Sequence, residues 1–516
     1  MDERVQGALR LLPDYLGQHV MLSAAALLLG LAISAPLVVL ALRSTRVRWP
    51  VLALVSVVQT VPSLALLALF YPVLLALSSL SERLFGHGFA ALGFLPSLLA
   101  LTLYSMLPIV RNGVTGLLNI DPAVLEAARG VGMTPRQSLF RVELPLAMPV
   151  IMAGIRTSAV WVIGTATLST PVGQTSLGNY IFSGLQIENW VSVLFGCISA
   201  VALALIADQL LALIENGVAT RRPMRAGVGL ALLIVGIAAA VVPSIHSTRP
   251  TYVVGAKSFS EQYILADLMT DRIARAGASA SQRAGLGSVI AFKALANNDI
   301  DAYVDYSGTV WANVLERKDS LPRVQMLEEM TRLLKQQYGV TLLGALGFEN
   351  AYALAMRRGD ASSRNVHTIA DLAAQAGELR LGTDFEFLAR PEWAALRDRY
   401  GLAFREQRQY QSTFMYRAVA SREVDVISAF SSDGRIAAYD LAVLEDPKQV
   451  ILPYDAIVLL SPRRANDATL RRALTPLIGA VPIGLMREAN QMVDRDENKV
   501  SPAQAAQWLA GKAGLK

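Results

Sequence analysis

The chain has 516 residues, of which 53% are hydrophobic and 17% are charged, and its mean hydropathy is +0.40. Soluble globular proteins are less apolar and more charged, so these values indicate that a large part of the chain lies in a lipid bilayer. The net charge of +6 is not gathered in a long basic run, which argues against a nucleic-acid partner, and the single cysteine, Cys197, excludes an intrachain disulfide and a cysteine-rich metal site.

Apolar runs long enough to cross a bilayer follow one another in the first half of the chain. They lie at about 20–42, 50–77, 90–110, 146–171, 191–214 and 226–250. No lysine occurs before the last of them ends, whereas the remaining chain carries lysines. We therefore predict a transmembrane domain over residues 1–225, a last transmembrane helix and linker over 226–250, and a second domain over 251–516.

Arginines cluster in three alternate loops, at 43–48, 111–141 and 221–225. Because positively charged loops stay in the cytoplasm, we expect these loops to be cytoplasmic and both termini, with the whole domain after residue 250, to be extracytoplasmic. Arg156 and Asp208 lie within or near the spans. Either they mark a polar path across the membrane, or they lie near the cytoplasmic helix ends and pair there.

The loop at 121–149, DPAVLEAARGVGMTPRQSLFRVELPLAMP, is the most specific stretch of the membrane half. Asp121 is predicted to cap a short helix that starts at Pro122, and Gly132 is predicted to end it. A second helix is expected to enter the membrane near Pro145. A short helix at the membrane surface is able to dock on another protein.

This loop resembles the cytoplasmic loop of ATP-binding-cassette (ABC) importer permeases. The pattern is EAA, three residues, G, nine residues, I, one residue, LP, and it is matched by Glu126, Ala127, Ala128, Gly132 and Leu144-Pro145, with Val142 in place of the isoleucine. The resemblance implies that Glu126, Ala127, Ala128 and Gly132 couple a homodimer of this chain to two copies of a cytoplasmic ATPase. The ATPase is expected to be a separate chain, because the sequence lacks a GxxxxGK[ST] phosphate loop, so this chain is not itself an enzyme.

Beyond residue 251, short β-like runs alternate with amphipathic helical stretches, which predicts an α/β domain. The runs are TYVVGA, DAYVDY, AYALAM, LRLGT, VDVISAF and AIVLL. The length suits two lobes. We expect the chain to cross between the lobes near Phe348–Met356 and again near Leu444–Pro453, so that the second lobe is an insertion in the first.

Three strand-to-helix junctions carry small and polar residues where helix N-termini would face a ligand. They are 258–262, 305–309 and 430–434, and they contain the candidate site residues Glu261, Gln262, Ser307, Thr309, Ser431 and Asp433. Each junction also has a purely structural interpretation. Ser258 with Glu261 fits a capping box, and Ser307 and Ser432 fit ordinary helix caps.

This half resembles the substrate-binding proteins of quaternary-amine importers in the motifs KSFSEQYILA, NNDIDAYVDYSGT, ENAYALAM, EFLAR and AFSSDGRI. Fused permease-and-binding chains of this kind also resemble ergothioneine uptake transporters. The resemblance implies an all-α, type I ABC importer permease of about six spans, fused to a two-lobed α/β domain like the periplasmic binding proteins, in the bacterial inner membrane. It implies glycine betaine, choline or carnitine as ligand, with ergothioneine as the alternative, and no metal or cofactor.

A trimethylammonium group has no hydrogen to donate, so a site holds it by the faces of several aromatic rings. The resemblance implies that Tyr306, Tyr352, Tyr410 and Phe430 form this box and that Arg390 pairs a ligand carboxylate. Asn350 stands where some relatives carry aspartate, which removes a possible anionic partner for the cation. Two alternatives stay open: the tyrosines are ordinary packing residues, or the chain is a membrane-anchored amine receptor that transports nothing.

Overall fold

The computed structural model describes residues 3–515 except 87, 90, 187–188, 221, 247–250, 318, 320 and 496. The chain divides into two compact units: Met1–Gly184 with Trp190–Thr248, and Leu185–Asn189 with Arg249–Lys516. Arg221 of the predicted cytoplasmic loop at 221–225, and the last four residues of the predicted segment 226–250, lie outside the described residues.

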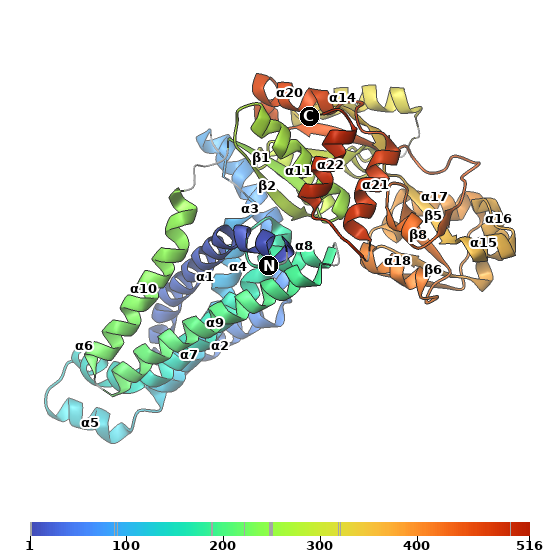
Figure 1. Cartoon of the computed structure of the whole chain (residues 1–516). Helices are drawn as coiled ribbons and strands as arrows, with labels where there is room; N and C mark the ends of the chain where they lie inside the picture. The colour runs from blue at the N-terminus through green and yellow to red at the C-terminus, as the bar shows by residue number, and fades with distance from the viewer. Residues whose placement is uncertain are drawn as a thin grey trace. The chain divides into compact units, whose positions relative to one another are not determined.

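The first unit is built from helices (Figure 1). They are α1 (Glu3–Arg43), α2 (Thr45–Thr60), α3 (Ser63–Phe85), α4 (Phe94–Leu118), α5 (Pro122–Gly130), α6 (Pro135–Ser138), α7 (Leu144–Ala166), α8 (Gly178–Gln186), α9 (Trp190–Ala219) and α10 (Pro223–His246). Within the described residues, six segments are long and apolar enough to span a membrane: Leu11–Leu42, Ser63–Phe85, Phe94–Leu118, Pro135–Val172, Trp190–Ala219 and Pro223–Val242. The predicted all-α membrane unit with about six spans is confirmed.

The run predicted at 50–77 is not one helix. α2 ends at Thr60 and α3 begins at Ser63. Val61 between them is extended, with φ −75° and ψ 128°, because the ring of the following Pro62 disfavours a helical residue before it. The prediction was therefore wrong in its bounds, and the spanning segment of this region is Ser63–Phe85.

The long helices pack closely around α4, which contacts α1 and α7, while α7 also contacts α9. Small residues make this approach possible: a Cβ atom added to Gly154 of α7 would lie 2.7 Å from the carbonyl oxygen of Pro108 in α4. A larger residue at position 154 would therefore separate these two helices.

Arg156 of α7 is paired with two carboxylates of α9. Its Nε and Nη2 each donate to Asp208 at 2.9 Å, and its Nη1 donates to Glu215 Oε2 at 2.7 Å. Charged groups in membrane helices are costly unless they are paired. The structure thus supports pairing as the role of Arg156 and Asp208, and the pair ties α7 to α9.

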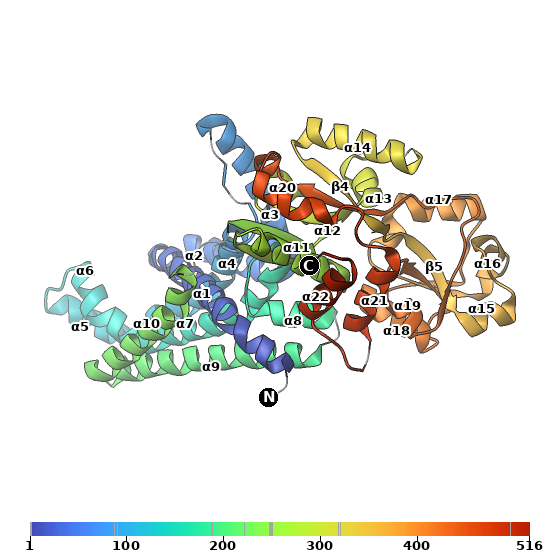
Figure 2. The same cartoon turned by 45° about the horizontal axis from the view of Figure 1, so that its top comes forward.

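The second unit contains two five-stranded sheets. Figure 2 labels β4 of one sheet and β5 of the other. The strands are β1 (Tyr252–Lys257), β2 (Ala280–Leu286), β3 (Ala302–Tyr306), β4 (Thr341–Glu349), β5 (Tyr352–Arg357), β6 (Arg380–Thr383), β7 (Glu406–Gln409), β8 (Val426–Phe430), β9 (Leu441–Val443) and β10 (Asp455–Leu460). One sheet has the order β2-β1-β3-β10-β4 and the other β7-β6-β8-β5-β9. The chain crosses to the second sheet between β4 and β5 and returns between β9 and β10, so the second lobe is an insertion, as predicted.

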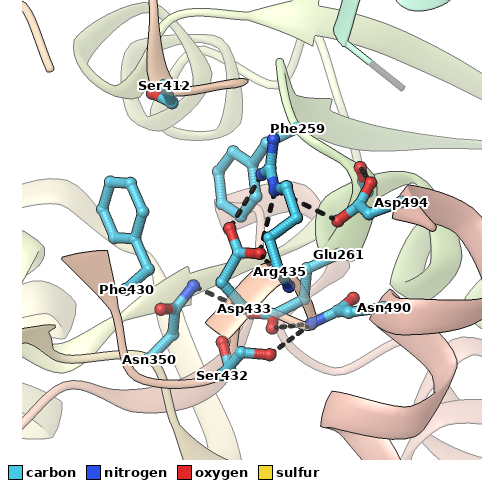
Figure 3. A pocket seen from close by; sticks show the side chains of 11 residues that line it. Phe259, Glu261, Asn350, Ser412, Phe430, Ser432, Asp433, Arg435, Asn490 and Asp494 are labelled. Carbon is cyan, nitrogen blue, oxygen red and sulfur yellow. Dashed lines mark hydrogen bonds and ion pairs between the residues drawn. The ribbon is translucent and has the colours of Figure 1, made fainter. Parts of the chain in front are cut away.

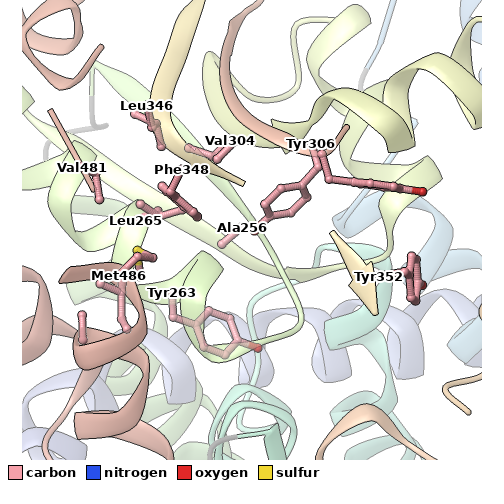
Figure 4. Close-up of a cluster of buried hydrophobic side chains, with 14 of the residues drawn as sticks. Ala256, Tyr263, Leu265, Val304, Tyr306, Leu346, Phe348, Tyr352, Val481 and Met486 are labelled. Atoms are coloured by element: carbon pink, nitrogen blue, oxygen red, sulfur yellow. The ribbon is translucent and has the colours of Figure 1, made fainter. Parts of the chain in front are cut away.

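In the first lobe α11 (Ser260–Arg275) packs on β1, and three further helices pack on α11: α20 (Ala468–Leu474), α21 (Ile483–Asp494) and α22 (Pro502–Lys512). Figure 4 shows part of the hydrophobic core that they enclose, including Leu265, Val304 and Phe348. Each such side chain contributes roughly 1.5–3 kcal/mol by its burial. Tyr306 and Tyr352 belong to the same buried cluster, so the core holds both rings in place.

Candidate functional site

The loop at 121–149 has the local structure that the sequence predicts. The Asp121 side chain accepts a hydrogen bond from the Ala123 N–H at 2.9 Å, and Pro122 begins α5. Gly132 has φ 81° and ends the helix, because its N–H donates to Arg129 O at 2.9 Å and the next N–H, of Met133, donates to Ala128 O at 3.1 Å. This is a Schellman motif, which requires a left-handed residue at the position of Gly132. α7 then begins at Leu144, next to the predicted Pro145.

The same loop presents an exposed surface. Glu126 and Ala127 are exposed, while Ala128 is buried. Two large apolar side chains nearby, Val131 and Phe140, are 73% and 67% exposed. Exposed apolar side chains beside charged ones are typical of a surface that binds another protein.

A cleft in the second unit is lined from both lobes, where β1, β3, β6 and β8 end. Ligands of α/β proteins commonly bind at the carboxyl ends of strands. The residues after 250 that line the cleft are Lys257, Ser258, Phe259, Leu286, Gly287, Ser288, Tyr306, Thr309, Asn350, Tyr352, Asp384, Phe385, Glu386, Arg390, Gln411, Ser412, Phe430 and Tyr454. Predicted residues Tyr306, Thr309, Asn350, Tyr352, Arg390 and Phe430 are thus brought together.

Aromatic rings form much of the cleft wall. The Tyr352 ring centroid lies 5.0 Å from that of Phe430 and 6.0 Å from that of Tyr454, and the Tyr306 ring lies 6.1 Å from that of Phe259. The sequence reasoning missed Phe259 and Tyr454. Phe259 was inside the motif KSFSEQYILA, whereas Tyr454 precedes β10 without any motif of its own.

Tyr306 is oriented by the buried residues behind it. Its hydroxyl donates to Glu261 Oε1 at 2.6 Å and accepts from Gln262 Nε2 at 3.0 Å. Glu261 also accepts hydrogen bonds from the side-chain amides of Asn350, at 3.1 Å, and Asn490, at 2.8 Å (Figure 3). Burial raises the pKa of the Glu261 carboxyl, and these donors oppose that shift. Glu261 and Gln262 therefore position the tyrosine; neither lines the aromatic cleft.

A second cavity of about 50 Å³ lies next to the cleft (Figure 3). Asp433 lines it, but its carboxylate is already paired: Arg435 Nε donates to Oδ1 at 2.9 Å and Nη2 donates to Oδ2 at 2.7 Å. A bidentate ion pair of this kind is a strong and geometrically specific interaction between arginine and a carboxylate. The structure thus gives Asp433 a partner within the protein.

Ser307 and Ser431 form hydrogen bonds with the backbone of the segments that connect the two lobes. Ser307 Oγ donates to Pro453 O and accepts from the Asp455 N–H, both at 2.9 Å. Ser431 Oγ accepts from the Ala351 N–H at 2.9 Å.

The capping interpretations of three serines were wrong. α11 begins at Ser260 after Phe259 without a side-chain cap, so Ser258 and Glu261 do not form a capping box. Tyr306 precedes the helical turn in which Ser307 is the first residue, and Gly434 precedes α19 (Arg435–Ala438) in place of Ser432. Each of these side chains lies one or two residues away from the position that a cap requires.

Tyr410 is half-buried and packs on a cluster that contains Met415 and Tyr416. Of the described residues that line the cleft, none is Tyr410, whereas the next two residues, Gln411 and Ser412, are both among them. Tyr410 therefore shares a buried cluster with Phe430 but is not among the described residues of the cleft wall.

Arg390 is almost fully buried, with its side chain 6% exposed. Nη2 donates to Glu386 at 2.9 Å, Nη1 donates to the Tyr454 hydroxyl at 3.3 Å, and the guanidinium carbon lies 4.9 Å from the centre of the Tyr352 ring. A second cleft cation, Lys257, forms a buried ion pair with Asp305. The cleft thus offers ring faces for a cation and a guanidinium for an anion.

Comparison with protein families covers both units. Residues 250–511 match the substrate-binding domain of the ABC-type glycine betaine transport system. The chain belongs to this glycine betaine transport family. Residues 26–220 match the inner-membrane component of binding-protein-dependent transport systems. The two matches confirm the predicted fusion of an ABC importer permease with its substrate-binding domain. Together with the six apolar helices they indicate a multi-pass protein of the inner membrane, and the permease family implies a cytoplasmic ATPase and a small ligand as partners.

Two proteins and one solved structure illustrate what this chain is similar to. The chain is 28% identical, over 82% of its length and 76% of the relative, to the ergothioneine transport permease/ergothioneine binding protein EgtU of Helicobacter pylori. It is 39% identical, over 39% of its length and 84% of the relative, to the choline transport system permease protein OpuBB of Bacillus subtilis. A crystal structure of a glycine betaine/carnitine/choline ABC transporter has a TM-score of 0.45 and 27% identity, covering 51% of this chain and 98% of that one.

Proposed function

We propose that this chain is the permease and substrate-binding subunit of an ATP-driven importer for quaternary ammonium compounds of the glycine betaine, choline and carnitine type. The observation that carries this proposal is the cleft in which Tyr306, Tyr352 and Phe430 meet from two lobes beside Arg390. Each ring face that meets the cation contributes about 0.5–2 kcal/mol, and the guanidinium pairs a carboxylate where the ligand has one. The bounds 1–225, 226–250 and 251–516 stay a prediction.

An ergothioneine-specific importer is the second candidate. It is favoured by the fused arrangement that the chain shares with the Helicobacter pylori protein over 82% of its length. Ergothioneine carries a trimethylammonium group beside a carboxylate, so it needs the same ring faces and the same guanidinium.

The proposed assembly is a homodimer through the membrane unit with two copies of a separate ATPase. The exposed surface of the loop at 121–149, with Glu126, Ala127, Val131 and Phe140, supports docking of the ATPase there. The ATPase supplies the hydrolysis, and this chain supplies the ligand site and the path.

The role of the cation is tested by an analogue of the ligand in which carbon replaces the quaternary nitrogen. In calorimetry of the purified chain, glycine betaine should bind at least about ten-fold more tightly than tert-butylacetate, which has the same shape but no positive charge to attract the ring faces. Equal binding of the two compounds, or no binding of any quaternary amine, would contradict the proposal.

The membrane topology gives a further prediction. A reporter fused after Lys516 should be active only on the extracytoplasmic side, and a reporter inserted near Arg136 only in the cytoplasm, because arginine-rich loops remain inside. The pair of fusions controls for expression. Activity in the reverse compartments would show that the assignment of the loops is inverted.

The aromatic wall predicts a contrast between two rings. Phe430→Ala should weaken binding of quaternary amines by roughly 0.5–2 kcal/mol, because Phe430 lines the cleft. Tyr410→Ala is the matched control, since Tyr410 packs on the cluster behind the cleft and its loss should leave affinity nearly unchanged. Titration calorimetry of both variants measures this, and an equal loss in Tyr410→Ala would place Tyr410 in the box after all.

A further inference from the structure

The cleft wall contains three buried polar atoms that lack a hydrogen-bond partner among the described residues. They are Asp384 Oδ2, Asn350 Oδ1 and Arg390 Nε. In folded proteins, nearly all buried polar atoms are hydrogen-bonded, because an unbonded one has lost its water without replacement. A ligand that satisfies these two acceptors and one donor has to offer two hydrogen-bond donors and one acceptor.

Asp384 is held so that only one of its oxygens is free. It follows β6, and it is 4% exposed. Its Oδ1 accepts the N–H groups of Glu386 at 2.7 Å and Phe387 at 2.9 Å. These two bonds fix the carboxylate at the start of the next helical turn and leave Oδ2 in the wall of the cleft without a donor.

Asn350 is fixed in a similar way at the crossing between the lobes. Its backbone N–H donates to Tyr454 O at 2.9 Å and its Nδ2 donates to Glu261 Oε1 at 3.1 Å. Because Glu261 is an acceptor, the amide nitrogen points to it and Oδ1 is the atom left over. Asn350, which lines both the cleft and the second cavity beside it, thus carries a second free acceptor.

We infer that Asp384 and Asn350 accept hydrogen bonds from the ligand, which is a trimethylammonium carboxylate with an N–H or O–H donor of its own. This rests on the proposed function, since the ring faces hold the cation. Glycine betaine has no donor and leaves both acceptors unbonded. Choline has a hydroxyl but no carboxylate for Arg390 Nε. Carnitine offers a carboxylate and one hydroxyl, and ergothioneine offers a carboxylate and two ring N–H groups, which match the two acceptors.

Matched pairs of ligands test the inference on the full-length chain in detergent. L-carnitine and γ-butyrobetaine differ only in the hydroxyl, and ergothioneine and its ring-N,N′-dimethyl analogue differ in the N–H donors. In calorimetry, the donor-bearing member of at least one pair should bind about ten- to a hundred-fold more tightly, because its partner leaves a buried acceptor without a hydrogen bond.

Two variants assign the preference to Asp384. Asp384→Asn keeps an oxygen for the two backbone N–H groups and replaces the free acceptor with an amide donor, so the preference should disappear. Glu386→Gln removes one charge from the same wall, but Glu386 pairs Arg390 and has no free buried oxygen among the described atoms. It should weaken both members of a pair alike and keep the preference.

The outcomes separate this inference from the proposed function. If the wild-type chain binds both members of each pair equally, or if the preference survives in Asp384→Asn, the inference is overturned while quaternary-amine binding stands. If no quaternary amine binds at all, the proposed function fails, and the inference fails with it.

Discussion

Glu126→Ala and Gly132→Ala should each abolish ATP-driven uptake while ligand binding to the second unit stays unchanged. Gly132 has φ 81° and no atom near its missing side chain, so alanine there meets backbone strain of roughly 1–2 kcal/mol rather than a clash. The strain disrupts the helix end that orients the exposed Glu126 and Ala127. Uptake of labelled ligand and calorimetry on the same preparations measure the two functions separately.

Gly130→Ala is the matched control for this prediction. Gly130 is the last residue of α5, has no positive φ and also has no atom near its missing side chain. Alanine is favourable in a helix, so uptake should be retained. Loss of ligand binding in Glu126→Ala or Gly132→Ala, with the protein still inserted in the membrane, would show that the loop does not have the coupling role.

Arg390→Ala should weaken glycine betaine, carnitine or ergothioneine by roughly 1.5–3 kcal/mol and leave choline nearly unaffected. The difference arises because choline has no carboxylate for the guanidinium to bind. The Glu386 side chain, which pairs Arg390, is 53% exposed, so its carboxylate remains hydrated after the substitution. Calorimetry with choline and glycine betaine on the wild type and the variant isolates the contribution of the carboxylate.

Arg380→Ala provides the control for Arg390. Arg380 belongs to the same lobe, and its Nε forms an ion pair with Asp425 Oδ2 at 3.0 Å. Arg380 is not among the described residues that line the cleft. Its loss should change the affinity for neither ligand. Equal losses for choline and glycine betaine in Arg390→Ala would exclude the carboxylate role and leave Arg390 as a structural partner of Glu386 and Tyr454.

The strands that the sequence predicts are the six central strands of the two sheets, and the four that it misses, β2, β4, β7 and β9, are the four edges. Central strands are buried on both faces and read as apolar runs. β7, with the sequence EQRQ, is exposed throughout and has no apolar pattern. β4, with the sequence TLLGALGFE, contains Gly344 and Gly347, which have no side chain and so interrupt the alternating pattern that marks a strand.

The site was predictable where a motif includes the residues that touch the cleft. Tyr306, Tyr352 and Phe430 end or begin central strands, so their positions follow from the strand pattern. Tyr410 directly follows the edge strand β7 and packs on a buried cluster, while the next two residues, Gln411 and Ser412, line the wall. Tyr454 reaches the cleft because it packs over Gly308, where an added Cβ would lie 2.6 Å from the Tyr454 ring, a contact between segments far apart in sequence.

Transport itself is tested most directly in proteoliposomes that contain the chain with the ABC ATPase that co-purifies with it. With labelled ligand on the side of the second unit and ATP on the side of the loop at 121–149, the proposed importer accumulates the ligand. It accumulates none with a non-hydrolysable ATP analogue. Binding of the ligand without accumulation, at full ATPase occupancy, would contradict the importer and favour a receptor.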